Sequence, residues 1–87
     1  MNTFQLILSS PDGDIYRGPA QRLSLRGAEG DLAVMAGHIS FVTTVKPGKC
    51  RVILEDDTVR TGHVDGGLLS VSKDAVTLLS ASFHWEE

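Results

Sequence analysis

The sequence contains a single cysteine and no long run of apolar residues, and both features restrict the setting of the protein. Because Cys50 is the only cysteine in 87 residues, no disulfide can form within the chain, and a reducing compartment is expected. No apolar run approaches the roughly 20 residues that a membrane-spanning helix needs. The first residues also lack the positive segment that opens a signal peptide. The sequence therefore predicts a soluble protein.

Clustered positive charge and aromatic residues are also scarce. Eight Lys and Arg residues are outnumbered by eleven Asp and Glu residues, which gives a net charge of −3. Arg17, Arg22 and Arg26 are spaced too widely for a polybasic stripe, so nucleic-acid binding is not expected. The aromatic side chains are three Phe, one Tyr and one Trp, too few to build a platform on which a ligand stacks.

Residue types used in metal binding and catalysis are present but are not grouped. The three histidines, His38, His63 and His84, lie far apart and lack the tight spacings of structural zinc sites. Cys50 lies in an alternating apolar stretch, where a buried inert thiol is expected rather than a nucleophile paired with His63. The phosphate-binding pattern Gly-x-x-x-x-Gly-Lys-Ser/Thr is absent. We expect no metal, no cofactor and no catalytic residues.

The sequence does contain short stretches in which apolar and polar residues alternate. A period of two places one set of side chains on a buried face of a strand, and no window has helical periodicity. The stretches cover residues 4–9, 22–26, 50–54, 58–60, 69–72 and 75–79. Turn-forming residues separate them, notably at 10–13 and 55–57. This pattern predicts an all-β fold, a small β-sandwich of short antiparallel strands, as one domain over residues 1–87.

Two glycine-containing sites give specific backbone predictions. Pro47-Gly48 is typical of the centre of a type II turn, because proline fixes φ at the first position and glycine adopts positive φ at the second. Gly66-Gly67 comes at the start of an expected strand. The missing Cβ atoms there predict a bulge, a bend or the close approach of another backbone.

One loop and one turn are further candidates for function. Glu29 and Asp31 flank Gly30 in an expected exposed loop, where their carboxylates would repel a phosphate but could meet a partner. Lys73 lies in the turn before residue 75. Biotinyl and lipoyl carrier domains are all-β and present a modified lysine at a hairpin tip, but here Asp74 follows the lysine, which favours a plain turn. A free-standing carrier or ligand-binding module is the alternative function. A small hydrolase would need a nucleophile and base that the sequence does not supply.

Several motifs occur in an order that matches one known family over nearly the whole chain. They are Pro-Asp-Gly at 11–13, Gly18, Ala-Glu-Gly-Asp-Leu-Ala-Val-Met-Ala-Gly-His at 28–38, Thr-Thr-Val-Lys-Pro-Gly at 43–48, Val-Asp-Gly-Gly-Leu at 64–68 and Asp-Ala-Val-Thr-Leu-Leu at 74–79. In this order they resemble the epsilon subunit of bacterial and chloroplast F-type ATP synthases, equivalent to the mitochondrial delta subunit. The sequence departs from that family at Ala36 for the usual proline, Asp65 for the usual serine and Leu68 for the usual aromatic residue. Asp65 adds a charge near an expected partner surface.

The resemblance implies a non-catalytic β-sandwich in the central stalk. Such a domain contacts the gamma subunit with one surface and the polar loops of the membrane rotor ring with its lower end, so that ion translocation is coupled to ATP synthesis. It would be peripheral to the cytoplasmic face of the membrane through the complex. By position, the predicted rotor-ring contact is Glu29, Gly30 and Asp31. The predicted gamma-subunit contacts are Ser10, His38, Thr43 and Leu68.

The resemblance is restricted to the sandwich. Most family members continue into an Ala- and Glu-rich helical hairpin that can inhibit ATP hydrolysis. The final stretch, residues 80–87, shows no such pattern, which fits either a naturally short member or a truncated chain. Inhibition and nucleotide binding by a C-terminal helical hairpin are therefore not expected of this sequence, and the choice of H⁺ or Na⁺ lies in the ring.

Overall fold

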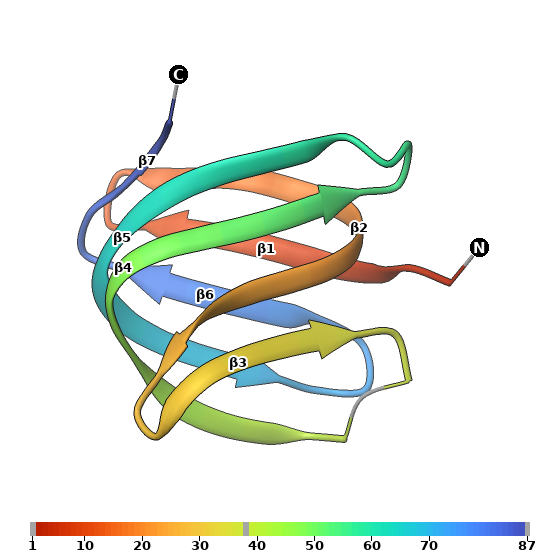
Figure 1. Cartoon of the computed structure of the whole chain (residues 1–87), viewed down its shortest axis with the longest axis horizontal. Coiled ribbons are helices and arrows are strands. Elements are labelled where there is room, and N and C mark those ends of the chain that lie inside the picture. The colour runs from red at the N-terminus through yellow and green to blue at the C-terminus, as the bar shows by residue number, and fades with distance from the viewer. Residues whose placement is uncertain (1, 38, 87) are drawn as a thin grey trace.

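The chain folds entirely from β-strands (Figure 1), as a computed structural model of residues 2–37 and 39–86 shows. The strands are β1 (Phe4–Ser10), β2 (Gly13–Gly27), β3 (Gly30–Met35), β4 (Phe41–Leu54), β5 (Val59–Val71), β6 (Val76–Ser80) and β7 (Phe83–Trp85). No described residue is helical, so these ranges also hold no helix long and apolar enough to cross a membrane. The prediction of an all-β fold is confirmed.

The strands form one continuous ladder that closes on itself. The order is β1-β6-β5-β4-β2-β3, β7 pairs with β5, and β1 also pairs with β2. The five strands β1, β2, β4, β5 and β6 therefore form a ring, which Figure 1 shows flattened into two facing layers. One pair differs from the expected antiparallel arrangement, because β1 and β6 are parallel. A ring with an odd number of strands cannot alternate direction throughout, so at least one parallel pair is unavoidable.

The longest strands run through both layers instead of ending at each predicted turn. β2, β4 and β5 contain 15, 14 and 13 residues. β2 pairs with β1 through residues 13–20 and with β3 through residues 22–27. In Figure 1, β4 and β5 curve together from one layer to the other. The short strands of the prediction are thus segments of longer, bent strands.

The predicted type II turn at Pro47-Gly48 is wrong, because both residues lie within β4. Pro47 faces Asp65 of β5, and the Asp65 N–H donates to the Ser82 carbonyl at 3.0 Å instead of to β4. Pro47 therefore lies opposite a residue that does not donate to β4, and the missing proline N–H removes no hydrogen bond to β5. Gly48 has φ of +154°, which glycine adopts without strain. Pairing along the whole of β4 and β5 therefore overrides the local turn preference.

The core lies between the two layers and follows the alternation in the sequence. Its fully buried side chains are Leu6, Leu8, Leu23, Cys50, Val52, Leu69, Val76 and Leu78. They come from all five strands of the ring. The prediction of a close approach at Gly66-Gly67 is confirmed, although the pair lies inside β5 and not at its start. A Cβ atom on Gly67 would overlap the carbonyl oxygen of Leu79 in β6.

Candidate interaction surfaces

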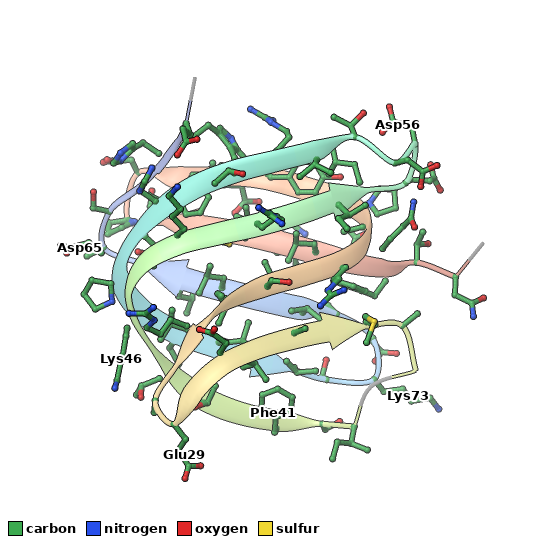
Figure 2. All side chains as sticks on the ribbon, in the orientation of Figure 1. Glu29, Phe41, Lys46, Asp56, Asp65 and Lys73 are labelled. Carbon is green, nitrogen blue, oxygen red and sulfur yellow. The ribbon has the colours of Figure 1, made fainter. Side chains whose placement is uncertain are left out.

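The acidic loop, residues 28–31, connects β2 to β3 at one end of the sandwich. Gly27 pairs with Gly30, so the connection is a tight hairpin with Ala28 and Glu29 at its tip. Gly30 has φ of +133°, a conformation that side chains other than glycine rarely adopt. In Figure 2, Glu29 extends away from the body of the domain. Glu29, Gly30 and Asp31 are all exposed, as expected of a contact loop.

The start of β4 lies beside the acidic loop. A shallow depression of about 360 Å³ is lined by residues 27–32 on one side and by Phe41, Val42 and Thr43 on the other. Thr43 is half-buried, and its hydroxyl donates to the Thr44 carbonyl at 3.3 Å. The structure therefore brings Thr43, predicted as a gamma contact, next to the predicted ring contact.

A second surface, the neutral face, covers the outside of one layer. It consists of eight outward side chains from β4, β5, β6 and β1, and the exposed side chains of Lys46 and Gln5 lie at its border. Strand pairing aligns them in two rows, Val42-Ser70-Thr77-Ile7 and Thr44-Leu68-Leu79-Ser9. Every side chain in it is aliphatic or carries a hydroxyl. Val42, Leu68 and Leu79 are 63%, 41% and 49% exposed, and because contiguous exposed apolar side chains are common at protein interaction sites, this face is a candidate interaction surface.

The predicted gamma contacts are distributed around the neutral face. Leu68 lies within it. Ser10 ends β1 and stabilises the turn into β2, because its hydroxyl donates to the Gly13 carbonyl and accepts the Asp12 N–H, both at 3.3 Å. Thr43 lies on β4 between the outward residues Val42 and Thr44. His38 lies outside the described residues. Val42 and Leu79 were missed by the sequence reasoning.

Lys73 and Cys50, which the sequence analysis weighed as a modified lysine and a nucleophile, lie in a hairpin turn and in the core. Lys73 is exposed in the turn between β5 and β6, where the Ser72 hydroxyl and the Ser72 N–H both donate to the Ala75 carbonyl at 2.9 Å. Cys50 is fully buried, and burial raises the pKa of its thiol to about 12. It is therefore a protonated core side chain at neutral pH. The described residues contain no group of three or more side chains able to hold a metal ion.

These features define a small β-sandwich domain with two candidate interaction surfaces. Residues 3–86 match the family described as the beta-sandwich domain of the ATP synthase delta/epsilon chain, and the protein belongs to that family. Members of this family are non-catalytic subunits of ATP synthase, which confirms both the resemblance seen in the motif order and the prediction that the domain is not an enzyme.

Two solved structures share the fold. A chain of the mitochondrial ATP synthase of Euglena gracilis superposes with a TM-score of 0.90 at 24% identity, over 98% of this chain and 54% of that chain. A chain in the central stalk and c-ring structure of the Tetrahymena thermophila mitochondrial ATP synthase superposes with a TM-score of 0.78 at 11% identity, over 93% of this chain and 65% of that chain. The present chain thus spans about half the length of the Euglena gracilis chain. The β-sandwich fold is the feature that these matches establish.

Proposed function

We propose that this domain is part of the central stalk of an F-type ATP synthase, where it links the gamma subunit to the membrane rotor ring. In that position it would couple ion translocation to ATP synthesis. The observation that carries the proposal is the family match over residues 3–86. The domain would be peripheral to the cytoplasmic face of the energy-transducing membrane, held there by its partners. Its task would be mechanical, because members of its family are non-catalytic subunits of ATP synthase.

The neutral face is proposed as the surface that contacts gamma. Leu68 and its ladder partner Leu79 provide apolar area, and the neighbouring hydroxyl groups of Thr44, Ser70 and Thr77 can form hydrogen bonds to a partner. Subunit interfaces are depleted of charged residues at their centre. The absence of charge among these eight side chains therefore fits a permanent contact.

The acidic loop is proposed as the contact with the polar loops of the rotor ring. It projects from one end of the sandwich, so it can reach a second partner while the neutral face is occupied. The carboxylates of Glu29 and Asp31 would meet basic or amide groups on the ring. Such contacts contribute register and orientation more than affinity.

The gamma contact is tested by placing a charge on the neutral face. Leu68→Asp is expected to weaken binding to the gamma subunit of the same organism by at least about tenfold, because a buried unpaired carboxylate is costly. Val59→Asp is the matched control, since Val59 is a 53%-exposed apolar residue on the same strand but outside the neutral face. Co-elution and calorimetry measure both. If Val59→Asp weakens binding as much as Leu68→Asp, or if the unmodified domain does not bind gamma, the proposal is wrong.

The ring contact is tested by reversing charge at the acidic loop. Glu29→Lys is expected to reduce capture of the domain–gamma complex on the purified rotor ring by about tenfold at low salt, with gamma binding unchanged. Glu55→Lys is the control, because Glu55 is an exposed carboxylate in the β4–β5 turn. Its neighbour Asp56 lies at the end of the domain opposite Glu29 in Figure 2. Equal capture of the two variants would contradict the assignment.

A further inference from the structure

The pairing between β2 and β4 is interrupted in the layer opposite the neutral face. Ser24 pairs with Arg51, but the next pair joins Gly27 to Val45, so β4 has more residues than β2 between these two points. Residues 46–50 of β4 therefore have no partner in β2. An open depression of about 820 Å³ lies here, bordered by β2, β3, β4 and Glu86. It lies on the opposite layer from the neutral face.

Half of the basic residues of the protein line this depression, which we call the basic hollow. Arg22 and Arg26 come from β2, and Lys49 and Arg51 come from β4. The two pairs are far apart in the sequence and become neighbours only because β2 and β4 pair. All four side chains are exposed. They are concentrated in one place on a chain whose net charge is −3.

The carboxylates at the edge of the basic hollow neutralise it only in part. Asp31 lies 3.8 Å from the Arg26 Nε, and Glu86 lies 3.9 Å from the Lys49 Nζ. Both are long, solvent-exposed contacts, which contribute little stability. Within the part of the chain that the structure describes, neither Arg22 nor Arg51 forms an ion pair. Two guanidinium groups are thus available to carboxylates from outside.

The spacing of the cations fits an extended chain. Lys49 and Arg51 alternate on one strand, which places their Cα atoms about 7 Å apart, and Arg22 and Arg26 lie about 13 Å apart along β2. A single phosphate cannot reach across these distances. Carboxylates on alternate residues of an extended segment repeat at about 7 Å, and arginine binds carboxylate in a bidentate geometry. Ile53 and Leu32, both half-buried, provide apolar contacts in the same depression.

We propose that the basic hollow is a docking site for an acidic, extended segment of a partner polypeptide. This surface is additional to the two contacts proposed above and would serve a third partner segment in the assembly. Charge complementarity argues for the occupant. A concave surface fits a single peptide strand better than a flat bilayer, and the carboxylates of Asp31 and Glu86 at its edge disfavour the continuous phosphate charge of nucleic acid.

The test measures binding of a fluorescent peptide of alternating Glu and Val to the whole domain by anisotropy. The expected result is binding that weakens with salt, and that Arg22→Glu with Arg51→Glu weakens by about tenfold or more. The control is Lys46→Glu with Lys73→Glu, which changes net charge equally at exposed lysines outside the hollow. This control is expected to change binding less than about twofold. Arg22→Gln with Arg51→Gln is expected to act in the same direction with a smaller effect.

Several outcomes would overturn the proposal. They are no peptide binding, equal weakening by the control pair, equal binding of a peptide with Lys in place of Glu, and tighter binding of anionic lipid vesicles or duplex DNA than of the acidic peptide. Gamma binding of the same variants is measured in parallel. Leu68→Asp tests the gamma contact at the neutral face, and Arg22→Glu with Arg51→Glu tests the basic hollow. Failure of the gamma proposal is therefore distinguishable from failure of the peptide-docking proposal.

Discussion

Leu69→Ala is expected to destabilise the domain by about 2–5 kcal/mol, because it removes a fully buried side chain and leaves a cavity. Leu69 is 0% exposed between the two layers. A domain of this size has a free energy of unfolding of about 5 kcal/mol. The variant should therefore be substantially unfolded or melt at a much lower urea concentration, which circular dichroism in a urea titration measures.

Leu68→Ala is the matched control for this change. It deletes the same atoms from the neighbouring residue of β5, but Leu68 points outward and is 41% exposed. Its expected cost is about 0.5–1 kcal/mol. Leu68→Ala should remain folded but bind gamma more weakly than the unmodified domain, because it shortens a side chain of the neutral face. Equal urea midpoints for the two variants would contradict the assignment of inner and outer faces.

Gly67→Ala is expected to cost about 1–3 kcal/mol or more, although it adds a single methyl group. The added Cβ would overlap the Leu79 carbonyl oxygen, which belongs to the backbone and cannot rotate away as a flexible side chain does. Either β5 or β6 must therefore shift. The change should lower the urea midpoint and selectively increase hydrogen exchange at the amides of β6.

Thr44→Ala is a suitable comparison for the glycine variant, because Thr44 is exposed on the same layer. Its expected effect is within about 0.5 kcal/mol. A Gly67→Ala variant as stable as Thr44→Ala, with unchanged exchange in β6, would show that the two backbones do not constrain each other as described.

The sequence predicted the core well because alternation depends only on neighbouring residues. In the pair Leu68-Leu69, alternation over residues 69–72 groups Leu69 with Val71, but in the pair Leu78-Leu79 alternation alone could not choose. Consecutive strand residues point to opposite faces, so one leucine of each pair must be exposed, and the ladder register decides which one. The register places Leu68 beside Leu79. The signal for the neutral face in the sequence was therefore the presence of two Leu-Leu pairs. Their exposed members, Leu68 and Leu79, become neighbours in the sheet.

Other features depend on pairing between segments distant in the sequence. The parallel pairing of β1 and β6 follows from the number of strands in the ring, which no local pattern encodes. Pro47-Gly48 is predicted as a turn by its own chemistry, but it lies in a strand because β4 pairs with β5 on both sides of it. The basic hollow was missed because Arg22 and Arg51 are brought together by the β2–β4 ladder. By contrast, the acidic loop depends on local glycines and could be predicted directly.

The closure of the ladder through the β1–β2 pair has a mechanical consequence. An open, curved sheet twists easily, because its two edge strands can slide past each other. A sheet closed into a ring resists twisting, because every pair of neighbouring strands must shear together. The pairing of residues 4–10 with residues 13–20 closes the ring of strands in this domain. A twisting load applied at the acidic loop would therefore be shared by hydrogen bonds around the whole circumference. The first hairpin of the chain would therefore decide how faithfully rotation at one end of the domain is transmitted to the other.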